Sequence, residues 1–492
     1  METYRNFVGG EWVASRAGET VPNLNPGDTR DLVGLVPCST AEEARAAVEA
    51  AARAQKAWRK VPAPERGRVV ARARAAMERR KEEIARALAR EEGKTLKEAR
   101  GEVQKTLNLL EYFSGEGLRA MGETFPSEIP NTFCYTVRQP LGVVAAITPW
   151  NFPVSIPSWK IAPALVTGNA VVLKAAEQTP WTAELVVRCF EEGGVPPGVL
   201  NLVHGLGPVV GQALIDDPRV AAVSFTGSNE VGHHIYRRGA EGLKRVQCEM
   251  GGKNPVVVLA DADLALAAEG TAQGAFGSTG QRCTATSRAI VEEAVADRFV
   301  ALVRERAERL RAGPGLDERS EMGPSIDEAQ LAKVIEYMGV GRAEGAAVLC
   351  GGARLTEGDL AHGYFPAPTL LDRVRTDMRV AREEIFGPVL SVIRVRDFDE
   401  ALAAANAVPY GLTSSIYTGD VARWHRFVEE IETGITHLNS PTMGGEPQLP
   451  FGGMKATGIG NREMGRAAID FFTEVKAVYA DYTGRKRESN VY

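Results

Sequence analysis

Four short apolar segments decide the fold: GVVAAIT (142–148), NAVVLKA (169–175), VLNLVHG (199–205) and VAAVSFTG (220–227). Each is rich in β-branched residues, and each is followed by about a dozen residues with the apolar spacing of a helix. Strands that alternate with helices in this way, and that are apolar throughout, are typical of a parallel sheet covered on both faces. The sequence therefore predicts an α/β fold built on βαβ units.

The flanking sequence extends this pattern. Residues 41–120 are predicted to be helical, with their charged residues on solvated faces. After Gly252 a second alternation of strands and helices begins with NPVVVLAD (254–261), which indicates a second α/β domain. Residues 121–140 and 470–484 alternate weakly and match no neighbouring helix. We expect these two strand-like segments to pair with each other or with another subunit.

Composition narrows the class of protein. A chain of 492 residues with a net charge of −5 and no long basic run gives no electrostatic reason to expect nucleic acid or an anionic membrane as partner. The sequence has no signal peptide pattern and no apolar run long enough to span a bilayer. Its six cysteines are scattered singly, which is typical of reduced thiols. We expect a cytoplasmic protein that acts on a small molecule.

Several features of the first sheet favour a dinucleotide. SFTGSNEVG (224–232) ends a strand and opens a helix, so its backbone amides would hold a pyrophosphate, although a tight turn explains it equally. GLGPVVG (205–211) is a weaker second candidate. Lys174 and Glu177 follow another strand end, where Glu177 would accept hydrogen bonds from ribose hydroxyls or form an exposed ion pair with Lys174. Their occurrence in one parallel sheet favours dinucleotide binding.

Three further residues are candidates for catalysis. Cys283 follows Arg282 in STGQRCTATSR (278–288), where a guanidinium would lower the pKa of the thiol and make it a nucleophile. Glu249 precedes two glycines, where a carboxylate can swing and reach water. Asn151 lies in the turn TPWNFP (148–153), where its amide would donate to an oxyanion. Taken singly, Cys283 has the alternative of an ordinary loop cysteine, Glu249 that of an exposed carboxylate, and Asn151 that of a structural residue, which is the commoner role of a turn Asn.

The motifs taken in order resemble those of the aldehyde dehydrogenase superfamily, and the resemblance covers essentially the full chain. Departures are small, since Ala175 stands where many members have Pro and Met250 where Leu is usual. The matching segments are TPWNFP (148–153), VVLKAAEQTP (171–180), SFTGSNEVG (224–232), EMGGKNP (249–255), GQRC (280–283), EEIFGPV (383–389) and LPFGGMKATGIG (449–460).

The resemblance implies an architecture of three parts. These are a Rossmann-like parallel-sheet cofactor domain (1–119 and 141–251), an α/β catalytic domain (252–455) and a small β oligomerisation arm with the C-terminal segment (120–140 and 456–492). Homodimers and homotetramers are both common in the family, so either assembly is expected.

The resemblance also implies a mechanism. Cys283 would attack the aldehyde, Asn151 and the Cys283 backbone N–H would hold the oxyanion, and Glu249 would activate the water that hydrolyses the thioester. NAD is the expected cofactor, with NADP possible, and no metal is required. The expected cofactor contacts are Ile147, Thr148, Pro149, Trp150, Lys174, Glu177, Gly207, Gly211, Phe225, Thr226, Gly227, Ser228, Val231, Met250, Gly251, Glu384 and Phe386.

Two segments, 278–288 and 436–453, look most like bacterial 2-oxoglutarate semialdehyde dehydrogenases and more distantly like succinate semialdehyde dehydrogenases. Phe152 and Trp159 match substrate-tunnel positions, and Arg282 would pair with a carboxylate at the far end of the substrate or serve a structural role. The expected substrate is a carboxylate-bearing semialdehyde. A broad-specificity aliphatic aldehyde dehydrogenase and a cofactor-independent thiol esterase remain the alternatives.

Overall fold

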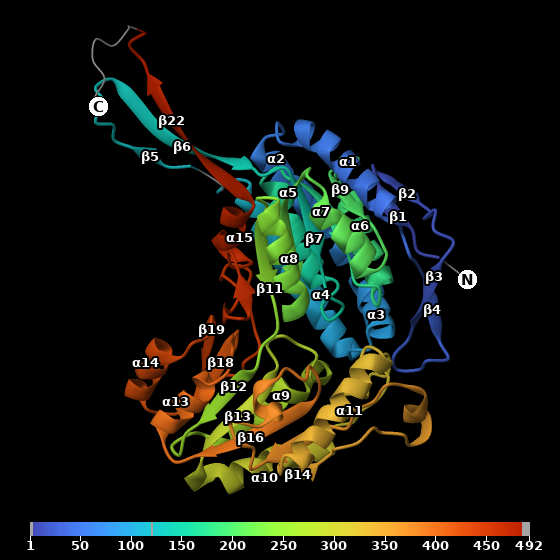
Figure 1. The fold of residues 1–492 in the computed structure, drawn as a ribbon, viewed down its shortest axis with the longest axis vertical. Helices are drawn as coiled ribbons and strands as arrows, with labels where there is room; N and C mark the ends of the chain where they lie inside the picture. Colours follow the sequence, from blue (N-terminus) through green and yellow to red (C-terminus); the bar gives the residue numbers. More distant parts are fainter. Residues whose placement is uncertain (1–2, 120–121, 485–492) are drawn as a thin grey trace.

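The computed structural model describes residues 3–119 and 122–484, which form two helix-covered sheets and a projecting arm (Figure 1). The first sheet forms the upper part of Figure 1, and its five inner strands, β9 to β11, are parallel. In spatial order its strands are β2 (Glu11–Val13), β1 (Asn6–Val8), β9 (Leu200–Leu202), β8 (Ala170–Lys174), β7 (Val143–Ile147), β10 (Val220–Thr226), β11 (Arg245–Glu249) and β21 (Gly458–Ile459).

Side chains alternate across the first sheet, as they must in extended strands. Val144 and Ala146 of β7 pack in the core formed with α2 (Ala63–Arg79), α3 (Lys81–Glu91), α4 (Leu96–Glu116), α5 (Ser155–Val166) and α6 (Pro180–Glu192). Val143 and Ala145 point to the other face, against α1 (Ala41–Trp58), α7 (Gln212–Asp216) and α8 (Asn229–Glu241). Both faces are thus buried, which explains why these strands are apolar throughout.

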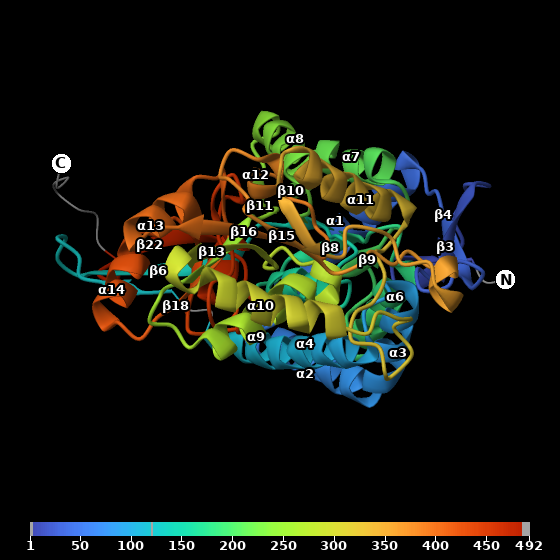
Figure 2. The same cartoon turned by 90° about the horizontal axis from the view of Figure 1, so that it is seen from below.

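The second sheet forms the lower part of Figure 1 and is parallel except for one edge strand, β14. Its order is β14 (Ala347–Cys350), β15 (Thr369–Asp372), β16 (Val389–Val395), β13 (Thr286–Glu292), β12 (Asn254–Val258), β18 (Thr413–Tyr417) and β19 (Ile435–Leu438). Figure 2 shows α9 and α10 on one side and α11 on the other. Its helices are α9 (Leu264–Phe276), α10 (Glu293–Arg309), α11 (Glu328–Ala343), α12 (Arg379–Arg382), α13 (Phe398–Asn406) and α14 (Val421–Glu430).

The arm projects from the first sheet and contains the two strand-like segments predicted from the sequence (Figure 1). β6 (Thr132–Pro140) pairs with β22 (Thr473–Asp481) along its whole length, and β5 (Thr124–Phe125) adds a short third strand. The prediction that these segments pair with each other is therefore confirmed. A short helix, α15 (Gly465–Phe471), leads into β22. Residues 120–121 and 485–492 of the expected arm lie outside the described residues.

Two expectations about the fold need correction. The first sheet is not wholly parallel, because β1, β2 and β21 pair antiparallel at its edges. The expectation that the charges of residues 41–120 lie on solvated faces is wrong around the start of α4, where Glu91, Glu92, Lys94 and Glu102 are all buried. Glu91, for example, accepts the backbone N–H groups of the first turn of α6. These charges hold elements together rather than face water.

A remaining β-hairpin, β3 (Thr20–Leu24) with β4 (Leu32–Pro37), and a two-residue pair, β17 (Tyr410–Gly411) with β20 (Met454–Lys455), complete the strands. No helix within residues 3–119 and 122–484 is both long and apolar enough to cross a membrane.

Candidate active site

The strand order of the first sheet creates a crevice at its carboxyl edge. From β7 the chain proceeds outward through β8 and β9, then returns to place β10 and β11 on the other side of β7. Ligands of open α/β sheets bind where the order reverses in this way, outside the carboxyl ends of the strands. A cavity of about 210 Å³ lies there, and its lining residues are Pro149, Trp150, Asn151, Ile156, Thr226, Gly227, Ser228, Met250, Gly251, Cys283, Gln330, Lys333, Glu384 and Phe386.

The other expected cofactor contacts do not line this cavity but lie along the same sheet edge. Lys174 ends β8, and its amine pairs with the carboxylate of Glu177 at 2.8 Å. The backbone carbonyl of Lys174 accepts the backbone N–H of Thr148. Gly207 and Gly211 bound a single helical turn after β9. Ile147 ends β7, Phe225 is in β10, and Val231 is in the first turn of α8. All the expected cofactor residues therefore gather at one edge of the sheet.

Cys283 is presented by a strained loop between α9 and β13. Ser278 and Thr279 adopt positive φ angles of 47° and 57°, and Gly280 follows at 66°. A Cβ on Gly280 would overlap the carbonyl oxygen of Gly387, so only glycine fits there. The side-chain amide of Asn254 donates to the carbonyl of Cys283 at 2.8 Å and ties the loop to β12. The thiol is thereby brought from the second sheet to the cavity of the first.

The electrostatics of Cys283 differ from the sequence expectation. Burial, together with the carboxylates of Glu249 and Glu384, raises the pKa of its thiol to about 12, and Lys105 opposes this shift. The guanidinium of Arg282 instead donates to Ser278, Glu98 and Met443. The expectation that Arg282 lowers the pKa of the neighbouring thiol is wrong, because every nitrogen of the guanidinium is engaged away from it.

Asn151 is held firmly beside Cys283. Its side chain is 4% exposed, and its amide nitrogen donates to the carbonyl of Gln281 at 3.0 Å, which leaves the second hydrogen of the amide for another acceptor. Its backbone carbonyl accepts from Lys94 at 2.7 Å, and Lys94 in turn pairs with Glu102 at 2.6 Å. The turn that carries Asn151 is therefore fixed by a buried ion pair.

Glu249 ends β11 and is buried, so the expected access of its carboxylate to water is absent in this conformation. It does not line the cavity that holds Cys283. Burial and the neighbouring carboxylate of Glu463 raise its pKa well above the ordinary value. Within the described chain one carboxylate oxygen of Glu249 has no hydrogen-bond partner. Glu463 itself forms an ion pair with Lys160.

Glu384 and Phe386 close the cavity from the second sheet. Glu384 accepts the backbone N–H of Gly252 at 2.9 Å, and its burial raises its pKa. Phe386 adopts a positive φ of 60°, a conformation that costs free energy for a bulky residue and is typical of functional sites. Its ring meets Trp150 edge-on, with centroids 5.4 Å apart. Two aromatic rings and one carboxylate thus form this wall of the cavity.

The two expected substrate-tunnel residues lie on the α4 side of Cys283. Trp159 is 5% exposed, and its ring lies 5.3 Å from that of Phe451. Phe152 lies beneath the amine of Lys94, 4.2 Å from its ring centroid. The sequence analysis missed Lys94 and Lys105 on this side, and Gln330 and Lys333 of α11, which line the cavity. No local motif marks them, because each lies in a helix or helix-flanking segment whose charges are normally solvated.

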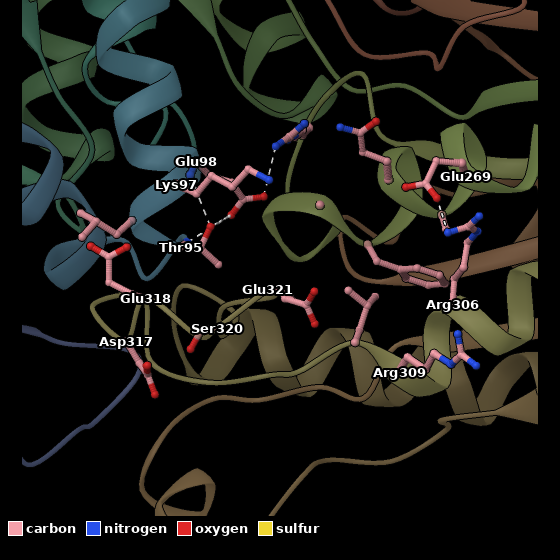
Figure 3. Close-up of a pocket in the computed structure, with 17 residues that line it drawn as sticks. Thr95, Lys97, Glu98, Glu269, Arg306, Arg309, Asp317, Glu318, Ser320 and Glu321 are labelled. Atoms are coloured by element: carbon pink, nitrogen blue, oxygen red, sulfur yellow. Dashed lines mark hydrogen bonds and ion pairs between the residues drawn. The ribbon is translucent and has the colours of Figure 1, made fainter. Parts of the chain in front are cut away.

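A larger polar pocket of about 710 Å³ lies on the outer side of Arg282, between α4, α9, α10 and residues 310–321 (Figure 3). Thr95 and Glu98 form the capping box that begins α4, and Glu98 also accepts from Arg282. Across the pocket Arg306 pairs with Glu269. Arg282 thus belongs to the charged wall of this outer pocket, whereas the Cys283 thiol faces the inner cavity.

Comparison with known proteins bears on this geometry. The profile of the Aldehyde dehydrogenase family matches residues 12–478. The chain belongs to the aldehyde dehydrogenase family. This result confirms the predicted family, the α/β architecture and an oxidoreductase that acts on aldehydes.

Individual relatives agree with this assignment. The chain is 47% identical to an alpha-ketoglutaric semialdehyde dehydrogenase of Bacillus subtilis, over 97% of this chain and 98% of the relative. It is 46% identical to an alpha-ketoglutarate semialdehyde dehydrogenase of Haloferax volcanii, over 97% and 99% of the two chains. Among solved structures, a betaine aldehyde dehydrogenase of Staphylococcus aureus in complex with NAD+ matches with a TM-score of 0.95 at 35% identity, covering 98% and 95%.

Proposed function

We propose that this protein oxidises 2-oxoglutarate semialdehyde to 2-oxoglutarate, with NAD+ as the oxidant and water as the oxygen donor. The aldehyde, NAD+ and water yield the carboxylate, NADH and two protons. The observation that carries the proposal is the meeting of Cys283 and Asn151 in one cavity at the crevice of the first sheet. The two semialdehyde dehydrogenases described above, similar over nearly the whole chain, support the choice of substrate.

Covalent catalysis accounts for the placement of the three candidate residues. The Cys283 sulfur bonds to the aldehyde carbon, and its proton leaves to a nearby base. The negative charge that develops on the carbonyl oxygen is stabilised by the free N–H of the Asn151 side chain and the backbone N–H of Cys283. After oxidation a thioester remains on Cys283. Glu249 then moves to the thioester and removes a proton from the attacking water, and the Cys283 thiol is released.

The residues at the sheet edge fit a dinucleotide. Trp150, Phe386 and Gly251 would hold a nicotinamide ring in the cavity that Cys283 also lines. NAD+ held there would supply the hydride acceptor for the oxidation of the Cys283 adduct. The N-terminus of α8, capped by Ser228, suits the pyrophosphate. The Glu177 carboxylate would accept hydrogen bonds from ribose hydroxyls and would repel the extra phosphate of NADP.

The remaining parts take the roles expected from the family. The first sheet serves as cofactor domain (1–119 and 141–251), the second as catalytic domain (252–455), and the β5–β6–β22 strands as oligomerisation arm, which gives a homodimer or homotetramer in the cytoplasm. Exposed Phe125, Phe133 and Tyr479 on the arm suit burial against another subunit.

The experiment compares the formation of NADH from 2-oxoglutarate semialdehyde and from pentanal, a neutral aldehyde of the same chain length. We expect a higher kcat/KM for the semialdehyde, and a higher kcat/KM with NAD+ than with NADP+. A preference for pentanal would contradict the proposed substrate. Turnover that needs no dinucleotide would instead support the thiol esterase.

A further inference from the structure

Three of the charged side chains of helix α4, those of Glu98, Glu102 and Lys105, are spaced so that they share one face. Glu98 accepts from Arg282 at 3.3 Å, and Glu102 from Lys94 at 2.6 Å. Both carboxylates are therefore already engaged by cations from outside the helix. Neither carboxylate forms an ion pair with Lys105.

The amine of Lys105 lies among aromatic and glycine residues instead. It sits 5.4 Å from the ring centroid of Trp159, and a Cβ on Gly445 would lie 3.5 Å from it. Within residues 3–119 and 122–484 no hydrogen bond or ion pair engages this amine, although the side chain is half-buried. A partly desolvated cation is costly unless an anion accompanies it. The indole N–H of Trp159 is buried and equally has no acceptor among the described residues.

Lys105 shares its surroundings with the reactive thiol. Its charge lowers the pKa of Cys283, and burial lowers the pKa of Lys105 itself, against the opposing influence of Cys283 and Glu102. Phe451 lies against both Trp159 and the Gly445 position, so these aromatic rings border the space beside the amine. Cys283 packs against the same apolar cluster as Trp159 and Phe451, so a carbon chain bonded to its sulfur would run along these rings toward the amine.

We propose that Lys105 determines the specificity for an acidic aldehyde: its ammonium group binds the carboxylate of the substrate, while Trp159 and Phe451 border the carbon chain. This inference rests on the proposed function and deepens it. It assigns to Lys105 the role that the sequence suggested for Arg282, whose guanidinium is held by Glu98, Ser278 and Met443. The missing counterion of Lys105 is then supplied by the substrate.

The test measures kcat/KM for 2-oxoglutarate semialdehyde and for pentanal in the full-length enzyme. Lys105→Met keeps the length of the side chain but removes its charge, and we expect it to lower kcat/KM for the semialdehyde by about 10- to 100-fold, mainly through KM. Pentanal turnover should change much less, because pentanal carries no carboxylate. Lys105→Arg should keep most of the preference for the acid. Lys97→Met replaces an exposed lysine of the same helix and should leave kcat/KM unchanged for both substrates.

Three outcomes would overturn the inference. An equal loss with both substrates would mean that Lys105 acts only through the Cys283 thiol or the fold, and Lys105→Gln repeats the measurement if the Met variant folds poorly. A preference that survives Lys105→Met but is lost in Arg282→Gln would assign the carboxylate to Arg282. A wild-type enzyme that prefers pentanal would overturn the proposed function itself, and this result is obtained before any variant is made.

Discussion

Two groups of buried and half-buried titratable side chains differ in how far their members pair within the protein, and this difference separates a structural role from a chemical one. The paired cluster consists of Glu92, Lys94 and Glu102, in which Lys94 lies 2.6 Å from Glu102 and 3.9 Å from Glu92. The unpaired cluster consists of Lys105, Cys283 and Glu249. Burial shifts the pKa of each of its members toward the neutral form: down for Lys105 and up for Cys283 and Glu249.

The difference teaches what each cluster is for. In the paired cluster Lys94 and Glu102 satisfy each other, whereas Glu92 lies farther from Lys94, and burial raises its pKa to about 8. The remaining donors and acceptors of the pair hold backbone groups: Lys94 donates to the carbonyl of Asn151, and Glu102 accepts the backbone N–H groups of Val154 and Ser155. Among the described residues, the members of the unpaired cluster form no hydrogen bond or ion pair with one another. Their groups can therefore bind substrate, protons or water. Three substitutions or measurements test this division.

Removing the thiol should have the largest effect. Cys283→Ala should leave no measurable formation of NADH, because the covalent adduct cannot form, while the free energy of unfolding should change by no more than about 1 kcal/mol. Steady-state turnover and urea denaturation check the two expectations, and quenching of tryptophan fluorescence by NAD+ checks that the cofactor still binds. Appreciable residual turnover would show that Cys283 is not the nucleophile.

A substitution in the paired cluster should mainly lower the stability of the fold, whereas Cys283→Ala should mainly abolish activity. Lys94→Met leaves Glu102 and Glu92 buried without their cation, and breaking such a pair from one side costs about 3–5 kcal/mol. Urea denaturation measures the loss, and Lys97→Met, which changes an exposed lysine of α4, should stay within about 0.5 kcal/mol of the wild type. An unchanged stability of Lys94→Met would erase the distinction between the clusters.

The sequence predicted the strands of the first sheet well and its edges poorly. β7, β8 and β10 are buried on both faces, so their apolar runs are unambiguous. In contrast, β1, β2 and β21 have only two or three residues each, and β1 and β21 join the sheet through partners far along the chain, β9 and β11. Helical periodicity also predicted that the charged side chains of residues 41–120 face water. That rule fails where a charge finds a distant partner, as Lys94 does with the turn of Asn151.

The candidate site shows the same limit. Motifs identified Cys283 and Asn151 as site candidates because their segments have unusual local composition, and the fold brings both residues to one cavity. They predicted that Arg282 lowers the pKa of the thiol, which is wrong, since adjacency in sequence puts its backbone beside the thiol but says nothing about which way a long side chain turns. Lys105 carried no local signal at all. Its significance depends on Glu98 and Glu102 being engaged by Arg282 and Lys94, and this is visible only in three dimensions.

The smallest expected effect concerns the protonation of Cys283 in the enzyme without cofactor. Because the pKa of the thiol is raised to about 12, its reactive thiolate fraction should grow about tenfold for each pH unit throughout the range from about 7 to 10. The rate of alkylation by iodoacetamide measures this fraction, and Cys283→Ala supplies the background from the other five cysteines. Lys105→Met should lower the rate further, because Lys105 is the cation that favours the thiolate. A rate that levels off below about pH 8 would reveal a thiol whose pKa is lowered. Cys283 would then resemble the paired cluster, in which neighbouring groups stabilise the charged form.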